Sequence, residues 1–168
     1  KVFGSEILDY VVDEAVQIHG GMGYSAEMSI EKGYRDSRIN RIFEGTNEIN
    51  RIIVTEATLK KGKKADFALD NKAEELYQKI DEMISQDCNT EGYYESIDMA
   101  FENFKKAILL VIYASNKEFG KNFLAEQEVV NNISNMISKT YLSESLALRV
   151  RKLENGNLKQ NINIYKDI

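Results

Sequence analysis

The sequence predicts an all-α protein, and two observations support that prediction. None of the 168 residues is proline, as long helices permit and turn-rich β proteins rarely show. Apolar residues recur at three- and four-residue spacing along several segments, which is the periodicity of one helix face. The longest apolar run, residues 107–114, is far shorter than the roughly 20 residues that cross a bilayer. We therefore expect it to be a buried helix segment.

The first two predicted helices are separated by a glycine-rich turn. Residues 5–18 carry apolar side chains at helical spacing, and Gly20-Gly21 is expected to end that helix. A second, shorter helix should carry Tyr34-Arg35-Asp36. Ser25 or Ser29 is expected to cap it, because a hydroxyl can accept a hydrogen bond from a free helical N–H.

A third helix should follow Glu44-Gly45, capped by Thr46 or Asn47. The lysine-rich run 60–64 would close it, since cations are favoured at a helix C-terminus. We place a domain boundary near Gly62, which divides the chain into residues 1–62 and 63–168.

The second domain is predicted to be an antiparallel helical bundle. Its helices are expected at about 67–86, 92–119 and 122–153, with a further one from about 157. The helix over 92–119 carries an apolar stripe that we expect to face the bundle core. The stripe consists of Ile97, Ala100, Phe101, Phe104, Ile108 and Val111.

Composition excludes several classes of protein. The formal charge is −5, from 22 basic and 27 acidic residues, and the basic residues are scattered among acids, so nucleic acid is not expected as a partner. A single cysteine, Cys88, cannot form an internal disulfide, and the one histidine has no cluster of metal ligands around it. The chain opens with Lys1 rather than methionine, and we expect it to be a piece of a longer protein.

Three short stretches could carry chemistry: residues 17–24, 34–36 and 41–49. Taken singly, each has an ordinary structural explanation. Glycines after a helix commonly cap it, and a lone histidine such as His19 more often packs or caps. Arg35 beside Asp36 is typical of structural salt links, and Glu44 before a helix would gain from the helix dipole.

Together, in this order and spacing, the stretches resemble the acyl-CoA dehydrogenase family. Gln17-Ile-His-Gly-Gly-Met-Gly-Tyr24, then Arg35-Asp36, then Phe43-Glu-Gly-Thr-Asn-Glu-Ile49 match the end of the C-terminal helical domain of these flavoenzymes. The resemblance covers residues 1 to about 62. It implies an enzyme of fatty acid β-oxidation that contains FAD and dehydrogenates fatty acyl-CoA to trans-2-enoyl-CoA.

The resemblance assigns a role to each matching residue. Glu44 would be the catalytic base that removes the α-proton while a hydride leaves the β-carbon for flavin N5. Its backbone N–H, with a flavin ribityl hydroxyl, would bind the thioester oxygen. Gly45 would lie against the substrate.

The resemblance also implies cofactor contacts in two subunits. Thr46, Asn47 and Glu48 match positions that contact FAD in the same subunit, although some members have Gln at the place of Glu48. Gln17, Ile18, His19, Gly20 and Gly21 match a segment that reaches the adenosine diphosphate part of FAD in the neighbouring subunit. A homo-oligomer with a shared FAD site follows.

Residues from about 67 onward resemble the helical domain appended in the very-long-chain branch of the family and its bacterial relatives. In that branch the domain is associated with dimer contacts or, in mitochondrial members, with membrane attachment. For this chain we favour a bundle core over a membrane surface.

The function would belong to the full-length parent, and we expect the isolated chain to be inactive. Electrons would pass to an electron-transferring flavoprotein, in the cytoplasm of a bacterium or the mitochondrial matrix of a eukaryote. Two alternatives stay open: a non-catalytic helical module for dimerisation or membrane docking, and an acyl-CoA oxidase on the same fold.

Overall fold

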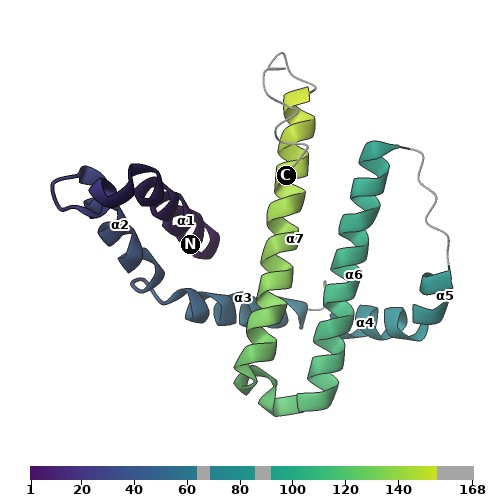
Figure 1. Ribbon diagram of the computed structural model, residues 1–168. Coiled ribbons are helices and arrows are strands. Elements are labelled where there is room, and N and C mark those ends of the chain that lie inside the picture. Colours follow the sequence, from purple (N-terminus) through teal and green to yellow (C-terminus); the bar gives the residue numbers. More distant parts are fainter. Residues whose placement is uncertain (64–68, 86–91, 155–168) are drawn as a thin grey trace. The chain divides into compact units, whose positions relative to one another are not determined.

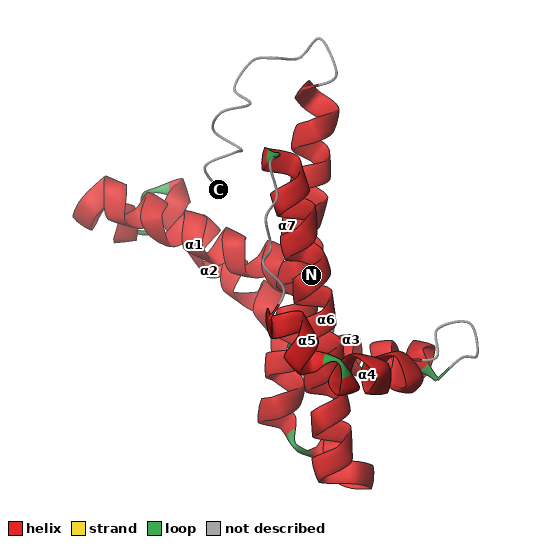
Figure 2. Cartoon of the chain, turned by 90° about the vertical axis from the view of Figure 1, so that its right-hand side faces the viewer, coloured by secondary structure: helices red, strands yellow, loops and turns green. Residues whose placement is uncertain are grey.

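A computed structural model describes residues 1–63, 69–85 and 92–154. Every regular element in these ranges is a helix, which confirms the predicted all-α class (Figures 1 and 2). The chain divides into two compact units, residues 1–54 and 55–168. This division falls inside a helix, upstream of the domain boundary predicted near Gly62, and that boundary stays a prediction. The expected helix from about 157 lies outside the described residues.

The first unit consists of short helices joined by tight turns. Its elements are α1 (Val2–His19), the 3-10 helix η1 (Gly20–Tyr24), α2 (Ser29–Arg38), the 3-10 helix η2 (Ile39–Arg41) and the first part of α3 (Asn47–Gly62). Gly20 ends α1 as predicted: its φ is 60°, and its N–H donates to the Gln17 carbonyl.

The predicted helix caps have mixed outcomes. Thr46 caps α3, because its Oγ1 accepts a hydrogen bond from the Ile49 N–H at 3.2 Å. The prediction of a serine cap on α2 is wrong. That helix begins after Met28, which has no side-chain oxygen, and Ser25 Oγ instead accepts a 3.4 Å bond from the Glu27 N–H within the preceding turn.

The second unit contains the end of α3 and four further α-helices: α4 (Leu69–Gln78), α5 (Ile80–Ser85), α6 (Tyr93–Phe119) and α7 (Gln127–Glu154). The single helix predicted over about 67–86 is wrong within the described range, since the chain turns at Lys79 between α4 and α5. The 3-10 helix η3 (Gly120–Ala125) joins α6 to α7, so α7 begins later than the predicted residue 122.

Helices α6 and α7 run antiparallel, as predicted for the bundle. Lys105 of α6 pairs with Glu144 of α7 at 2.7 Å, and Asp98, earlier in α6, pairs with Arg151, later in α7, also at 2.7 Å. Helix α4 crosses α6 (Figure 1), where the rings of Tyr77 and Tyr113 lie 5.8 Å apart.

The core of the second unit lies mainly between α6 and α7. Its buried apolar side chains come from α4, α6, η3 and α7, and they are Ala73, Ile108, Ile112, Phe123, Val130, Ile133 and Val150. Buried Thr55, at the start of this unit, donates from Oγ1 to the Val130 carbonyl at 3.0 Å.

The predicted apolar stripe of α6 is only partly buried. Ile108 is in the core, but Phe104 is 57% exposed and Val111 is 37% exposed. The buried face instead continues from Ile108 to Ile112 and Ser115, which lie four and three residues apart. The run 107–114, predicted to be a buried helix segment, is therefore buried only on the side that carries Ile108 and Ile112.

The apolar side chains of α1 are largely exposed within the chain. Ile7 is 61% exposed, Val11 is 53% and Ile18 is 81%, whereas Val12 and Ser5 are buried. None of the helices in the described residues combines the length and the apolar character needed to cross a membrane.

Candidate active site

The loop from η2 to α3 carries the predicted base. Glu44 has a φ of 56° and Gly45 a φ of 75°, so two successive residues adopt the left-handed region. This conformation is common for glycine and unusual for glutamate. Glu44 is exposed, and within the described residues its carboxylate has no hydrogen-bond or ion-pair partner.

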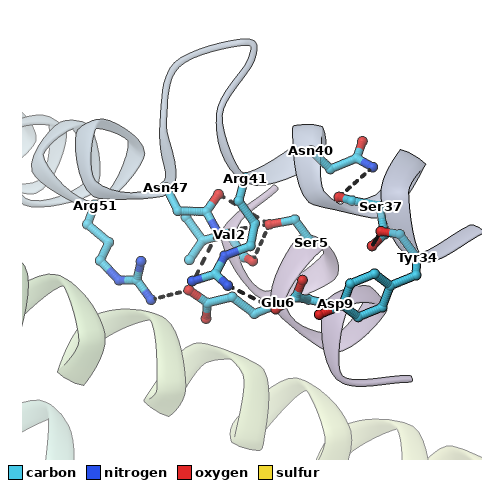
Figure 3. Close-up of polar contacts among 10 residues, drawn as sticks. All are labelled: Val2, Ser5, Glu6, Asp9, Tyr34, Ser37, Asn40, Arg41, Asn47 and Arg51. Atoms are coloured by element: carbon cyan, nitrogen blue, oxygen red, sulfur yellow. Dashed lines mark hydrogen bonds and ion pairs between the residues drawn. The ribbon is translucent and has the colours of Figure 1, made fainter. Parts of the chain in front are cut away.

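Asn47 anchors the start of α3 to α1 (Figure 3). Its Nδ2 donates to Ser5 Oγ at 2.9 Å, and the Ser5 hydroxyl lies 2.9 Å from the Val2 carbonyl. Asn47 is 1% exposed and Ser5 is 6% exposed. Because the side chain of Asn47 is taken up by this contact, a bond from Asn47 to a cofactor would have to come from its backbone.

Two ion pairs hold the same elements together (Figure 3). Arg51 NH2 of α3 lies 2.8 Å from Glu6 Oε1 of α1. Arg41 NH1, from η2, lies 2.9 Å from Asp9 Oδ2 of α1. Both pairs are partly screened from water, and they fix the two ends of the Glu44 loop against one face of α1.

Glu48 is exposed on the first turn of α3. Hydrogen bonds from its own backbone N–H and from Thr46 hold the pKa of its carboxyl below the usual value, and Arg51 and Arg41 add to this effect. An ionised carboxylate is also favoured at a helix N-terminus, where free N–H groups are concentrated. Glu48 is therefore negatively charged at neutral pH.

Residues 17–21 form a continuous exposed segment at the end of α1. His19 Nδ1 lies 2.8 Å from the Ala15 carbonyl, which fits an N–H donor to the preceding turn of its own helix. Gly21 has open space around its α-carbon, as does Gly20, so a ligand could approach this backbone closely.

The structure does not bring residues 17–21 to the Glu44 loop. Asn47 contacts Ser5 near the start of α1, whereas Gln17 lies near its end. Twelve residues separate Ser5 from Gln17, which corresponds to about 18 Å along a helix. The first unit therefore carries two separate candidate segments at opposite ends of α1.

Arg35 takes part in a salt link, as its structural interpretation predicts. Its Nε and NH2 donate to Glu31 Oε1 at 3.0 and 2.7 Å. These bonds with Glu31 raise the pKa of Arg35 above its usual value. The pair joins residues one turn apart on α2 and is exposed, so its contribution to stability is small.

The family can be decided from comparisons with known proteins. Residues 1–59 and residues 103–167 each match a family described as "Acyl-CoA dehydrogenase, C-terminal domain". The chain belongs to the acyl-CoA dehydrogenase family. It is 44% identical to a probable acyl-CoA dehydrogenase of Bacillus subtilis over 152 residues, which are 90% of this chain and 25% of the relative.

A solved acyl-CoA dehydrogenase supports the fold. The crystal structure of the Bacillus anthracis acyl-CoA dehydrogenase complexed with FAD matches with a TM-score of 0.85 and 41% identity. The match covers 98% of this chain and 28% of that one. This chain therefore spans about a quarter of the length of these acyl-CoA dehydrogenases.

Two further relatives match over shorter stretches. The human mitochondrial very long-chain specific acyl-CoA dehydrogenase is 52% identical over 64 residues, 38% of this chain and 10% of that protein. The caffeyl-CoA reductase-Etf complex subunit CarC of Acetobacterium woodii is 43% identical over 61 residues, 36% of this chain and 16% of that protein. The resemblance to acyl-CoA dehydrogenases read from the sequence motifs is thereby confirmed.

Sequence reasoning missed Asn50, whose side chain contacts the Glu44 loop. Its Nδ2 donates to the carbonyls of Gly45 at 2.8 Å and Thr46 at 2.9 Å. An asparagine in the first turn of a helix that follows a glycine-containing loop is a signal that could have indicated such a contact.

Among the described residues, no group of three or more His, Cys, Asp or Glu could hold a metal ion.

Proposed function

We propose that this chain is the C-terminal part of an FAD-dependent acyl-CoA dehydrogenase in which Glu44 removes the α-proton of a fatty acyl-CoA. The observation that carries the proposal is the state of Glu44: an exposed carboxylate without a partner in the described residues, held on a left-handed turn directly before α3. A purely structural glutamate would be expected to bond a neighbour or a free helical N–H.

The residues around Glu44 support proton removal in distinct ways. Gly45 has no side chain, so a substrate could pass close to the loop. Asn47, Arg41 and Arg51 fix the loop against α1, which keeps the carboxylate in place for a bound thioester. When substrate excludes water, a carboxylate in an apolar surrounding becomes a stronger base.

The segment from Gln17 to Gly21 fits the diphosphate of a cofactor. Its residues are exposed, and the two glycines have open space at their α-carbons, so a ligand could approach their backbone closely. FAD, when bound, would supply the hydride acceptor. Thr46, Asn47 and Glu48 at the start of α3 are proposed to contact FAD of the same subunit, Asn47 through its backbone, and residues 17–21 that of a neighbouring subunit.

The exposed face of α1 supports the view that the active protein is longer than this chain. An apolar stripe at helical spacing is normally buried, yet Ile7, Val11 and Ile18, which lie four and seven residues apart on α1, are largely exposed here. We infer that further parts of the parent cover this face. The isolated chain is then expected to bind FAD weakly and to turn over no acyl-CoA.

Partners and location follow from the same proposal. The parent would act as a homo-oligomer and pass electrons to an electron-transferring flavoprotein, in line with the name of the CarC relative, a subunit of a caffeyl-CoA reductase-Etf complex. The bacterial relatives support a cytoplasmic enzyme, and the match to the human very long-chain enzyme supports a fatty acyl-CoA substrate.

The test is an anaerobic titration of the full-length parent with acyl-CoAs of several lengths, following the absorbance of oxidised flavin. We expect bleaching in the native enzyme and a rate lower by about three orders of magnitude or more in Glu44→Gln, with FAD still bound. Glu14→Gln is the matched control, since Glu14 is also exposed in the first unit but lies on α1 away from the loop.

Each alternative predicts a different result. Equal bleaching in native enzyme and Glu44→Gln would show that another residue is the base. No bleaching in any of the proteins would favour a non-catalytic helical module. Rapid reoxidation of the reduced flavin by oxygen, with no electron transfer to an electron-transferring flavoprotein, would indicate an acyl-CoA oxidase.

A further inference from the structure

The turn that carries Glu44 requires an external restraint. A left-handed glutamate is sterically disfavoured, because its Cβ approaches the following carbonyl oxygen. Glu44 at a φ of 56° is the one non-glycine residue with positive φ in the described part of the chain. Left to itself, this backbone would relax and carry the carboxylate to a different place.

The side chain of Asn50 bonds the carbonyls of this turn. Asn50 Nδ2 lies 2.8 Å from the Gly45 oxygen, 2.9 Å from the Thr46 oxygen and 3.4 Å from the Glu44 oxygen. Three successive carbonyls therefore converge on a single amide. The Lys1 ammonium also donates to the Gly45 carbonyl.

These bonds do more than start the helix. At a helix N-terminus the groups that lack partners are N–H donors, and Thr46 Oγ1 already accepts from one of them, the Ile49 N–H. The Asn50 amide instead bonds carbonyls that precede the helix. Its effect is on the shape of the loop rather than on helix capping.

We propose that Asn50 is a positioning residue, which holds the Glu44–Gly45 turn left-handed and so keeps the Glu44 carboxylate where it can remove a proton. The inference rests on the proposed function of Glu44. Gly45 is adapted to the same contact: a Cβ added there would lie 3.2 Å from Asn50 Nδ2, on a backbone with a φ of 75°.

The test uses the full-length enzyme with bound FAD and rapid mixing with saturating acyl-CoA. Asn50→Leu removes the donors at similar size, and Asn50→Asp replaces them with acceptors that face the carbonyls. Both are expected to slow flavin reduction by about tenfold to a hundredfold, because a small misplacement of a catalytic group has effects of that order. KM should change by less than about twofold, since substrate binding itself is not altered.

Two further variants separate positioning from stability. Asn50→Gln keeps an amide donor and is expected to retain the native rate within about threefold. Asn40→Asp is the matched control, because Asn40 Nδ2 likewise bonds two carbonyls, those of Asp36 and Ser37, but these belong to the end of α2 and not to the Glu44–Gly45 turn. Its rate of flavin reduction should equal the native rate.

The kinetic isotope effect with α-deuterated acyl-CoA is the readout that a merely structural role would not change. Measured on steady-state turnover, it should approach in Asn50→Leu the isotope effect on flavin reduction itself, because slower proton removal then limits turnover, and it does not depend on the fraction of folded enzyme. Native rates of flavin reduction in Asn50→Leu and Asn50→Asp would overturn the inference while an inactive Glu44→Gln left the proposed function intact. A fully active Glu44→Gln would remove both.

Discussion

In the described part of the second unit, one isoleucine on each of the two long helices is almost fully buried, whereas two isoleucines on α1 of the first unit lie largely in solvent. Ile112 and Ile133 are each 1% exposed, but Ile7 is 61% and Ile18 is 81% exposed. Both sets are found on helices with apolar residues at helical spacing. The difference is in what covers them.

The comparison teaches that the two units depend on their surroundings to different degrees. The second unit builds its own core from α4, α6, η3 and α7. The first unit is held largely by polar contacts, such as Asn47 with Ser5 and Arg51 with Glu6, and leaves apolar surface uncovered. A segment whose apolar side chains are buried by other parts of a longer protein would show this combination of polar contacts and uncovered apolar surface.

The largest expected effect is in the core of the second unit. Ile133→Ala should lower the free energy of unfolding by about 2–5 kcal/mol, because it leaves a cavity among buried side chains. Urea denaturation of the 168-residue chain, followed by circular dichroism, would measure the change. Leu148→Ala, at a position 57% exposed on the same helix, is the control and should shift the free energy by less than about 0.5 kcal/mol.

A substitution on α1 tests whether the parent covers the first unit. Ile7→Ala should change the stability of the isolated chain by less than about 0.5 kcal/mol, as for other exposed positions. In the full-length parent it should cost about 2–4 kcal/mol if Ile7 is buried there. Thermal unfolding of both proteins would show the contrast, and equal small effects in both would contradict the proposed covering of α1.

The polar anchor of the first unit should contribute less than the apolar core of the second. Asn47→Ala leaves the buried Ser5 hydroxyl without one of its partners and should cost about 1–3 kcal/mol. Hydrogen exchange of the α1 amides would measure the local loss. Asn40→Ala, which removes bonds at the end of α2, should leave exchange in α1 unchanged.

The smallest expected effect is on the pH dependence of the second unit. The hydrogen bond from Arg151 holds the pKa of Asp98 below its usual value. A lowered folded-state pKa contributes stability that is present above the unfolded value of about 4 and is lost as pH falls through the folded value. Asp98→Asn should therefore flatten the fall of urea midpoints between about pH 5 and about pH 3. An unchanged slope would show that this exposed pair contributes nothing.

The sequence predicted the helices well where apolar periodicity and glycine agree. The predicted helix over 5–18 is α1, and Gly20 ends it because only the backbone of glycine adopts such a turn at low cost. The break at Lys79 was not predicted, since the sequence there has neither glycine nor proline and keeps its apolar residues at helical spacing.

The contacts of the candidate site were less predictable than its residues. Short motifs indicated Glu44, Thr46 and residues 17–21, but Asn47 binds Ser5 across a sequence separation of 42 residues. Local patterns carry no information about such pairs. The roles of all these residues toward FAD and substrate stay predictions. Asn50 was missed because the family motif ends at Ile49, although an asparagine in the first turn of a helix is a local signal for bonds to the backbone.

At Gly120, where α6 ends, the space around the residue does not predict whether a substitution is tolerated. Its φ is 51°, yet a Cβ added there would meet no atom within 4 Å. Gly33 has equally open surroundings but lies within α2 without a positive φ. In a survey of all single substitutions, alanine should be tolerated or even favoured at Gly33 and selected against at Gly120. The loss of alanine variants at Gly120 would then reflect the backbone conformation alone, because no neighbouring atom crowds the added Cβ.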